Sequence, residues 1–502
     1  MAGHFHVNAS HGNTEVQNKL KNYMDKAELL VLLTIFVPII GSLTIPLAGM
    51  ISKPVRSVWS IIIAAVTALC PLLLIPTALA GTELIIRKPL VMGLDLIFIV
   101  DALSIFMAIV SSSIGALIVV YSIGYVSHDD NQNEYYLMVL LFIGAMMGLV
   151  FSANLIYLYL FWEIAAIACW RLIGFYRKPK HILMADKAFL VTFFGAAAML
   201  LGFVIIYVKT GTFDITQMRG VMVPGIAVLF ILLGMFSKSA TVPLHTWLPD
   251  AGVAPSTVTA LLHAAVLVKI GVYAFARLFC YTFIIPAGWQ TALPIIAVIS
   301  SLVAACAATV EYDIKRILAY STVSQIGYIF LGLSVLNPAG VSGGLLFILM
   351  HGLGKAGLFL TAGIVEHNTH KRDIRELGGL IKTMPITAIC FIICAFSVIG
   401  IPPLGGFFSK FMVIMGTIQA GRPYVAVVAL CVAVLTAYYL LRFFNNVFLG
   451  EQKFQVPEQS RSMIIVVVVL TVLSVLAGVF IGYPVQLVNT ATLEILKGTK
   501  CI

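Results

Sequence analysis

The chain has 502 residues, of which 61% are hydrophobic and only 10% are charged. An ordinary soluble domain carries about 25% charged residues, so this composition excludes a soluble globular enzyme and indicates that lipid surrounds most of the chain. The formal net charge of +10 does not require a nucleic-acid partner, because membrane proteins keep Lys and Arg in their cytoplasmic loops.

The first 28 residues are polar and predict a flexible N-terminal arm. They lack the short apolar core of a signal peptide. They contain His4, His6 and His11, but three histidines without a fixed geometry make a poor metal site. We therefore expect an arm without a metal, followed by the membrane domain.

From residue 29 onward, apolar stretches recur that are long enough to cross a hydrocarbon core of about 30 Å. Their number predicts an all-α polytopic membrane protein with about fourteen transmembrane helices. The polar loops between them are short and leave no room for a soluble redox domain. The clearest stretches are Leu29–Met50, Val58–Ala80, Ala102–Val126, Met184–Val208, Val341–Val365 and Ser462–Ile481.

The basic residues fall in loops that share one side of the membrane if the N-terminus lies outside. Excess Lys and Arg mark cytoplasmic loops, so this pattern predicts an external N-terminus. Asp129, Asp130 and Glu134 lie on the same side and do not support this orientation, although acidic residues carry little weight in it. The basic loops hold Lys53 and Arg56, then Arg177, Lys178, Lys180 and Lys187, then Lys315 and Arg316, then Lys371, Arg372, Arg375 and Lys382.

Two apolar segments differ from the others because proline and glycine interrupt them next to a lysine. They are Gly234-Met-Phe-Ser-Lys-Ser-Ala-Thr-Val-Pro243 and Ile399-Gly-Ile-Pro-Pro-Leu-Gly-Gly-Phe-Phe-Ser-Lys410. Proline removes a backbone donor and clashes with the preceding turn, so Pro243 and the pair Pro402 and Pro403 should break each helix. Two such breaks are what an internally duplicated transporter would contain. Lys238 precedes the first break, and Lys410 follows the second.

Charged side chains inside the apolar spans are the main functional signal, because placing a charge in the bilayer centre is costly. Any one of them can be a structurally paired charge or a lysine that snorkels to the interface, as Lys410 would near a helix end. Several spread over neighbouring spans favour an ion pathway instead. His351 and Lys355 share one helical face because they are four residues apart. The groups are Glu163, Lys238, Lys269, His351, Lys355 and Lys410.

Arg171 lies eight residues after Glu163 in Cys169-Trp-Arg-Leu-Ile-Gly-Phe-Tyr. Two helical turns would bring it to nearly the same face as Glu163. It can equally mark the cytoplasmic end of its helix, and both interpretations stay open.

The eight cysteines show no CxxC pair and no Cys/His cluster, so we expect no metal or cofactor cage. No flavin, haem, nickel or iron–sulfur ligands are visible, so any electron transfer must occur in other subunits.

Seven blocks, in order over residues 100–450, together resemble the proton-translocating antiporter-like subunits. This family is shared by respiratory complex I, group 4 membrane-bound [NiFe] hydrogenases, including formate hydrogenlyase, and Mrp-type Na+/H+ antiporters. The blocks are Phe161-Trp-Glu163, Pro243-Leu-His-Thr-Trp-Leu-Pro-Asp250, Ala260-Leu-Leu-His-Ala-Ala265, Asp313-Ile-Lys-Arg-Ile-Leu-Ala-Tyr-Ser-Thr-Val-Ser-Gln-Ile-Gly-Tyr328, His351 with Lys355, Arg372-Asp-Ile-Arg-Glu-Leu-Gly-Gly-Leu380, and Gly400-Ile-Pro-Pro-Leu-Gly-Gly-Phe-Phe-Ser-Lys410.

The resemblance implies fourteen helices with two inverted five-helix repeats, each containing a discontinuous helix. It implies that Glu163 pairs with Lys238, that His263 and Lys269 are relay positions, that His351 and Lys355 form the central connection, and that Lys410 ends the second half-channel. Lysine at that last site is similar to the distal complex I subunit and its hydrogenase and Mrp relatives. The implied division is an arm (1–28), N-terminal helices (29–128), a first repeat (129–285), a second repeat (286–450) and a C-terminal segment with the last helix (451–502).

Two departures from the family pattern stand out. Arg171 lies where an uncharged stretch is usual, so it is expected to modulate the field around Glu163 or to contact another subunit. The chain also ends soon after its fourteenth expected span, without the long amphipathic arm of the distal complex I subunit.

The sequence therefore predicts a subunit that moves protons, or Na+, across a prokaryotic cytoplasmic membrane. Redox chemistry in partner subunits would drive it, with antiporter-like paralogues and a redox module as partners. The chain itself would hold no catalytic cofactor. The alternatives are an Mrp-type or self-contained Na+/H+ antiporter, a membrane scaffold whose charges only pair between helices, and uptake of inorganic carbon with a soluble partner.

Overall fold

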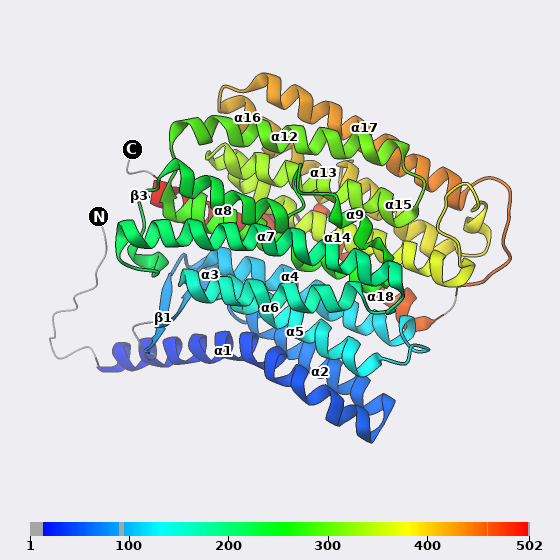
Figure 1. The fold of residues 1–502 in the computed structure, drawn as a ribbon, viewed down its shortest axis with the longest axis horizontal. Coiled ribbons are helices and arrows are strands. Elements are labelled where there is room, and N and C mark those ends of the chain that lie inside the picture. The colour runs from blue at the N-terminus through cyan, green and yellow to red at the C-terminus, as the bar shows by residue number, and fades with distance from the viewer. Residues whose placement is uncertain (1–13, 90–94, 459, 500–502) are drawn as a thin grey trace.

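The computed structural model describes residues 14–89, 95–458 and 460–499. Its helices run side by side in one elongated bundle (Figure 1). Among the described residues, 12 helical segments are long and apolar enough to cross a membrane. They are α1 (Thr14–Ile51), α2 (Lys53–Leu72) with α3 (Ile75–Leu79), α4 (Ala102–Tyr125), α5 (Gln132–Phe151), α6 (Leu155–Ile173), α7 (Pro179–Thr210), α10 (Ser256–Ala260) continued by η4 (Leu261–Ala265), α11 (Leu267–Phe275) and η5 (Ala276–Thr282), α12 (Ala287–Val310), α13 (Ile314–Ser334), α14 (Pro338–Thr369), α17 (Pro423–Phe448) and α18 (Arg461–Val479).

Two further spans are discontinuous, as the proline positions predicted. The first consists of α8 (Gly225–Lys238) and the short α9 (Trp247–Asp250), with Pro243 in the break. The second consists of α15 (Pro385–Ile399) and α16 (Gly405–Gln419), with Pro402 and Pro403 in the break. There, Gly400 has a φ of +95°, a conformation that side chains larger than hydrogen rarely adopt. With these two spans, the described residues form fourteen crossing segments, in agreement with the prediction of about fourteen.

The two broken spans run in opposite directions across the bundle. Gly225, at the start of α8, accepts a hydrogen bond from Trp289 near the start of α12, whereas Asp250 contacts Arg316 at the start of α13. Near the end of α16, the Gly416 carbonyl accepts a hydrogen bond from Asn337, which joins α13 to α14. Opposite directions are what inverted repeats require. The boundary between residues 285 and 286 stays a prediction.

The N-terminal arm differs from the expectation over part of its length. Helix α1 begins at Thr14, so the polar stretch up to Glu28 is helical and not a flexible arm. Tertiary contacts explain the difference: Tyr23 donates to Thr77 over 2.6 Å, and Glu28 pairs with Lys88. His4, His6 and His11 lie outside the described residues.

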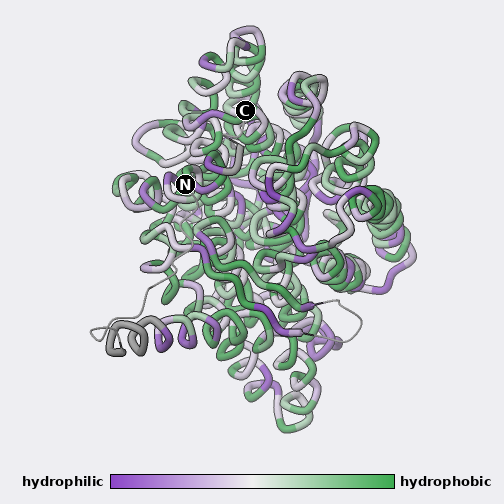
Figure 2. The backbone as a smooth tube through the Cα atoms, turned by 90° about the vertical axis from the view of Figure 1, so that its left-hand side faces the viewer, coloured by the Kyte–Doolittle hydropathy of each residue, from purple (hydrophilic) through white to green (hydrophobic). Residues whose placement is uncertain are grey.

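One end of the bundle carries elements that the sequence did not predict. Strands β1 (Leu84–Lys88) and β2 (Leu96–Val100) form an antiparallel hairpin in which Leu84 pairs with Val100. The amphipathic α19 (Gly482–Thr499) follows the last span and packs against α14, η5 and α4. We call this end, which Figure 2 views along the helices, the hairpin end. Smaller elements are η2 (Ile215–Gln217), β3 (Val221–Met222) parallel to β4 (Phe283–Ile284), η3 (Ala251–Val253) and η6 (Leu380–Lys382).

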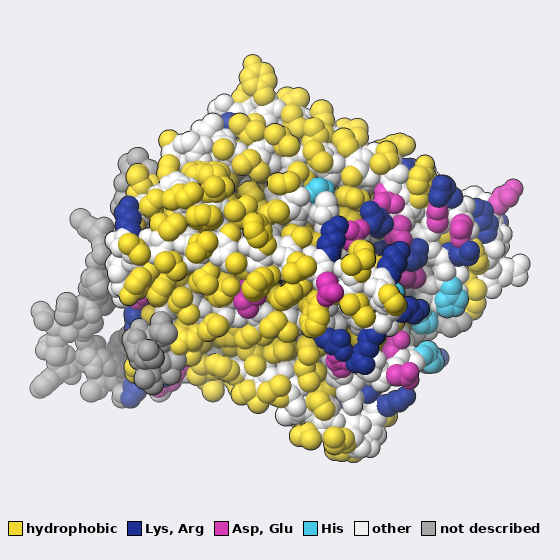
Figure 3. Space-filling model, viewed as in Figure 1, with side chains coloured by type: hydrophobic (Ala, Val, Ile, Leu, Met, Phe, Trp, Pro, Cys, Tyr) yellow, Lys and Arg dark blue, Asp and Glu magenta, His cyan; other side chains and the backbone are white. Residues whose placement is uncertain are grey.

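The opposite end gathers Lys and Arg together with Asp and Glu (Figure 3), and we call it the basic end. The predicted basic loops meet here, because Lys187 and Arg316 both bind Asp250, at 2.6 and 2.7 Å. Glu134 pairs with Arg171 and Arg177. Of the acidic residues that did not support the predicted orientation, Glu134 therefore neutralises two basic neighbours. Which side of the membrane the basic end faces stays a prediction.

A buried ion pair anchors the hairpin end. Asp101, which caps the N-terminus of α4, receives two hydrogen bonds from the Arg277 guanidinium, at 2.5 and 2.8 Å, and both side chains are fully buried. Glu494 of α19 accepts a hydrogen bond from the Ala102 amide at 3.0 Å beside this pair. The ion pair thus joins the start of α4 to η5, and the Glu494 hydrogen bond joins α19 to α4 beside it.

This arrangement predicts that the packing of α19 against the bundle depends on pH. Helix α19 itself is not among the candidate spans. Burial and the negative charge of Asp101 raise the pKa of Glu494 to about 8, from an ordinary value of about 4.3. Because the pKa is raised, the neutral carboxyl stabilises the docked helix at low pH, and this contribution is lost as the pH rises through about 8. We expect Glu494→Gln, which keeps an acceptor for the Ala102 amide, to lose less thermal stability than the native chain between about pH 5 and pH 9.

The measurement is the melting temperature of the purified protein in detergent, followed by tryptophan fluorescence across that range. Glu376→Gln, at an exposed ion pair with Lys371, is the matched control. Equal slopes for Glu494→Gln and the native chain would show that Glu494 is ionised when α19 is docked.

Candidate ion pathway

Lys238, the last residue of α8, is fully buried beside the break. Its Nζ donates a hydrogen bond to the Trp162 carbonyl of α6 at 3.4 Å and lies 5.5 Å from the centroid of the Trp162 ring. No carboxylate of the described residues lies within salt-bridge distance of this ammonium. The lysine is therefore held by a carbonyl and an aromatic face.

Glu163, next to Trp162, is half-buried, and it attracts Lys238 electrostatically without forming an ion pair. Its Oε1 is buried and has no hydrogen-bond partner. The residues one turn away on either side, Leu160 and Ile167, are exposed on the outer surface of the bundle. The predicted pairing of Glu163 with Lys238 is thus an attraction over a distance, and the carboxylate lies toward the lipid-facing side of α6.

His351 lies at the centre of the second group of predicted residues. It is fully buried on α14, and both ring nitrogens lack a hydrogen-bond partner. It interacts electrostatically with four other buried groups. These are Lys269, Lys355, His263 and Lys410.

Lys269 and His263 reach α14 from the segment that runs from α10 to η5. The Lys269 Nζ is fully buried without a partner and points at α14, since a Cβ added to Gly352 would lie 2.7 Å from it. His263 lies in the π-helical turn η4 and stacks on Phe359 of α14, with ring centroids 4.4 Å apart. Glycine at position 352 therefore lets the lysine approach His351 closely.

Lys355 and Lys410 each donate to a single backbone carbonyl. The Lys355 Nζ lies 3.2 Å from the Leu318 carbonyl of α13. The Lys410 Nζ lies 3.3 Å from the carbonyl of Ile399, the last residue of α15, which the break leaves without a helical donor. Lys410 is only 4% exposed, so it does not snorkel to the interface.

The pair at Lys238 joins the larger group through the backbone beside the break. Ser239 donates from its Oγ to the Val268 carbonyl at 3.0 Å, directly before Lys269. The structure thus brings His263, Lys269, His351, Lys355 and Lys410 into one electrostatic cluster. Glu163 and Lys238 form a separate pair that touches this cluster through packing.

Arg171 does not share the surroundings of Glu163. It lies in the last turn of α6 and pairs with Glu134 of α5, which also binds Arg177 at 2.6 Å. Of the two positions that the sequence left open, the structure places Arg171 at the helix end. Its modulating role stays a prediction.

Aromatic side chains complete the site, and the sequence did not single them out. The Lys410 Nζ lies 4.8 Å from the centroid of the Tyr328 ring and 5.4 Å from that of Phe347. Phe347 also contacts the His351 ring, with centroids 6.1 Å apart. Tyr328 ends the block that begins at Asp313, and Phe347 precedes His351 by one turn, so helical spacing from the lysines was the available signal.

Within the described ranges, no group of three or more His, Cys, Asp or Glu side chains could hold a metal ion. The buried side chains can instead exchange protons or cations. Charging two neighbouring lysines without a carboxylate is unfavourable in an apolar interior, so a charge on one lysine disfavours a charge on the next. This coupling is what a relay of charges needs.

A bundle of fourteen spans with two oppositely directed broken helices and a buried line of lysines is an antiporter-like membrane subunit. Residues 152–436 match the family described as NADH:quinone oxidoreductase/Mrp antiporter, TM. Residues 91–136 match the N-terminus of chain 5 of NADH-ubiquinone oxidoreductase (complex I). The chain belongs to the NADH:quinone oxidoreductase/Mrp antiporter family.

Curated relatives include Na(+)/H(+) antiporter subunits A1. The one from Staphylococcus haemolyticus is 34% identical over 93% of this chain and 63% of its own length. The one from Staphylococcus aureus is 32% identical over 90% of this chain and 61% of its own length. The chain thus spans about three-fifths of the length of these relatives.

Solved structures confirm the predicted fold. The chain resembles a chain of the Mrp complex from Dietzia sp., with a TM-score of 0.83, 23% identity, and coverage of 94% of this chain and 98% of that one. An archaeal membrane-bound sulfane sulfur reductase gives a TM-score of 0.85 at 24% identity, covering 94% and 98%. Respiratory complex I from Thermus thermophilus gives 0.82 at 24%, covering 93% and 99%.

Because the Lys269 ammonium is buried without a partner, we expect it to lower the stability of the folded chain. Lys269→Met should raise the unfolding free energy by about 1–3 kcal/mol, because a buried polar group without a partner is removed. Lys315 is the matched control, because its buried ammonium lies 2.6 Å from the Glu366 carboxylate. Lys315→Met should lower the unfolding free energy by about 3–5 kcal/mol, since it leaves the Glu366 carboxylate without its closest cation.

Chemical denaturation of the purified variants checks both signs. A loss of stability in Lys269→Met would mean that the ammonium has a partner, such as an internal water chain, and that the bundle gains from keeping it.

Proposed function

We propose that this chain moves protons or Na+ across the membrane as one subunit of a multisubunit complex. The proposed line consists of Glu163, Lys238, His263, Lys269, His351, Lys355 and Lys410. The observation that supports it most is that Lys238, Lys269, Lys355 and Lys410 are all buried, yet no described carboxylate forms a salt bridge with them. Buried cations without partners are rare in membrane spans and mark ion pathways.

In the proposed mechanism, a change of charge at one group of this line changes the electrostatic field at the next group. A change of charge in a neighbouring subunit would act first on Glu163, which lies at the outer surface of α6. The altered field would change whether Lys238 holds its proton. The cluster around His351 would respond, because each of its members interacts with His351, and Lys410 would exchange its ion with one side of the membrane.

An Mrp-type Na+/H+ antiporter is the assembly that the relatives favour. The Staphylococcus proteins are described as Na(+)/H(+) antiporter subunits, and they match at least nine-tenths of this chain. In this assembly the partners would be other membrane subunits, among them antiporter-like paralogues, and Na+ would move against H+.

A redox-driven respiratory or hydrogenase complex is the second candidate. The family that contains this chain includes NADH:quinone oxidoreductase by its description. A separate redox module would then supply the driving force, because the described cysteines are all free and form no cluster.

We place the basic end in the cytoplasm and the hairpin end outside, in the cytoplasmic membrane of a prokaryote. The excess of Lys and Arg at one end supports this orientation. Helix α1 begins at the hairpin end, so the N-terminus would be external.

Purification of the complex from its native membrane separates the candidates. Co-purification of small membrane subunits with Na+-driven proton movement in vesicles supports the antiporter assembly. A co-purifying [NiFe] or quinone-reducing module supports the redox complex, and a soluble partner would support inorganic carbon uptake. Exchange by the chain alone in liposomes would show a self-contained antiporter, and assembly without transport would leave a scaffold.

Glu163→Gln should abolish ion translocation by the assembled complex, because it removes the charge that acts on Lys238. Assembly should persist, since the carboxylate forms no ion pair in the described chain. In a redox complex, much of the electron transfer should persist as well. Proton movement in inverted membrane vesicles, followed with a pH-sensitive dye, is the measurement.

Glu376→Gln is the control, because this exposed carboxylate pairs with Lys371 far from the line. Translocation at the native rate in Glu163→Gln would remove Glu163 from the pathway.

A further inference from the structure

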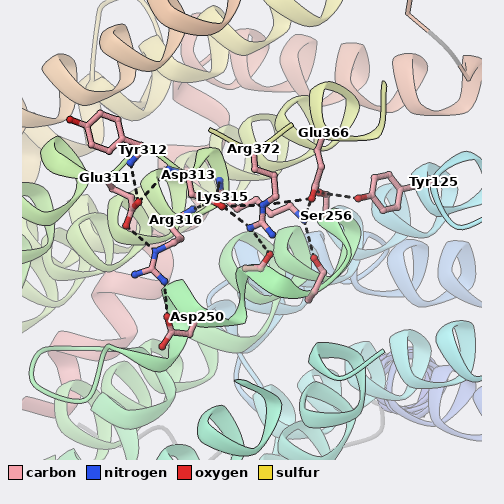
Figure 4. Close-up of polar contacts among 12 residues, drawn as sticks. Tyr125, Asp250, Ser256, Glu311, Tyr312, Asp313, Lys315, Arg316, Glu366 and Arg372 are labelled. Carbon is pink, nitrogen blue, oxygen red and sulfur yellow. Dashed lines mark hydrogen bonds and ion pairs between the residues drawn. The ribbon is translucent and has the colours of Figure 1, made fainter. Parts of the chain in front are cut away.

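At the basic end, a short segment is pinned at every second residue. We call this segment, Asp250–Ser256, the strap. It connects the first broken helix to α10, and Figure 4 shows Lys315, Arg316, Glu366 and Arg372 around it. Asp250 binds Lys187 and Arg316, the Gly252 carbonyl accepts from Arg372 at 2.9 Å, the Ala254 carbonyl accepts from Lys315 at 2.9 Å, and Ser256 donates to Glu366 at 3.0 Å.

Most of the residues that hold the strap come from the predicted second repeat. Lys315 and Arg316 begin α13, while Glu366 lies near the end of α14 and Arg372 follows it. The ion pair of Lys315 and Glu366 is the innermost contact, with 2.6 Å between the charged atoms. We call this pair the latch.

The latch lies directly outside the ion pathway. His263 lies seven residues inward from Ser256, along α10 and η4. Phe359 lies seven residues inward from Glu366, along α14. The rings of His263 and Phe359 stack on each other. The two segments therefore pack along one another, joined at the basic end by the hydrogen bond from Ser256 to Glu366 and at the pathway by ring stacking.

These two segments are in close contact at Gly363 of α14. A Cβ added to Gly363 of α14 would lie 2.7 Å from the Ser256 Cβ and 3.1 Å from the Tyr121 hydroxyl. Real side-chain contacts this short do not occur, so only glycine fits. With the latch formed, α10 and α14 touch at this point between the basic end and His263.

A hinge separates the strap from the rest of the pathway. His263 lies in the π-helical turn η4, and Val266 after it has φ −124° and ψ −71°, outside the helical region. π-turns carry one extra residue and are frequent at functional sites. A shift of α10 can therefore be absorbed at η4 without moving Lys269 in α11.

We propose that the strap is a gate for ions, held shut by Lys315 and Glu366, between the basic end and His263. This gate rests on the proposed function, because it matters only if ions reach His263. When Lys315 leaves Glu366, the partner of Ser256 keeps only the longer contact with Arg372, at 3.7 Å, and α10 can move away from Gly363. Water then reaches His263 from the basic end. Lys315 and Glu366 act as positioning residues and do not carry the ion.

The test measures water access and not transport, so it stays decisive if the proposed function fails. Thr259, buried on α10 between Ser256 and His263, is replaced by cysteine in the full chain in its native membrane. Inside-out vesicles expose the basic end in the proposed orientation. The rate of labelling by a membrane-impermeant thiosulfonate is compared with that of the parent chain, which contains only the native cysteines.

We expect slow labelling of Thr259→Cys alone and faster labelling, by about ten- to a hundredfold, when Glu366→Gln removes the charge-assisted contacts of the latch. Gly363→Ala should also raise the rate, because its methyl group pushes α10 away from α14 without altering any charge. Asp373→Asn is the matched control, since Asp373 pairs with the exposed Arg375 at the same end and does not touch the strap.

Unchanged labelling in Glu366→Gln and Gly363→Ala would overturn the gate. Fast labelling of Thr259→Cys with the latch intact would also overturn it, and this outcome needs no second variant. If Glu366→Gln fails to accumulate in the membrane, the labelling rate of Thr259→Cys in the Gly363→Ala variant alone tests the gate. Loss of transport in Glu163→Gln has no bearing on these rates, so the two proposals can fail separately.

Discussion

The bundle is organised around ammonium groups that lie in an apolar interior without carboxylates beside them. Each buried lysine of the line has at most one carbonyl as a direct hydrogen-bond partner, and Lys269 has none. Elsewhere in the same chain, the buried charges of Asp101 and Arg277 pair with each other through two short hydrogen bonds. Burying a charge costs several kcal/mol unless it is paired, so the contrast within one protein separates structural charges from the line.

The broken helices explain how this cost is reduced. The break after α15 leaves the Ile399 carbonyl free to accept from Lys410, and the break after Lys238 lets Ser239 bind the Val268 carbonyl. Carbonyl and aromatic contacts stabilise an ammonium less than a carboxylate does. The lysines are therefore held in place without being locked in the charged state.

Hydropathy and proline positions were sufficient to predict the crossing segments and both breaks, because lipid imposes a fixed length and an apolar composition. The hairpin of β1 and β2 was missed, since its strands are short and their pairing depends on contacts between distant residues. Helix α19 was not predicted because its amphipathic sequence does not resemble a transmembrane span. The arm before Glu28 is helical from Thr14 because Tyr23 and Glu28 find partners near α3 and on β1, which no local pattern records.

The sequence indicated the residues of the proposed line but not their geometry. Charged side chains in apolar spans indicated Glu163, Lys238, Lys269, His351, Lys355 and Lys410, and the family resemblance added His263. Whether Glu163 would touch Lys238, or Arg171 would lie near Glu163, depends on how α5, α6 and α8 pack. The π-helical turn that carries His263 is likewise a result of tertiary packing.

Phe347 has a consequence for how the two ends of the cluster communicate. Its ring lies beside both groups, with its centroid 6.1 Å from that of the His351 ring and 5.4 Å from the Lys410 ammonium. A benzene ring neither donates nor accepts a proton, so transfer between these residues needs the ring to swing aside or solvent to pass around its edge. Side-chain rotations of this kind are fast compared with movements of whole helices. The rate of transfer between His351 and Lys410 would then depend on one side-chain torsion of Phe347. Helix α14, which carries Phe347, could remain still.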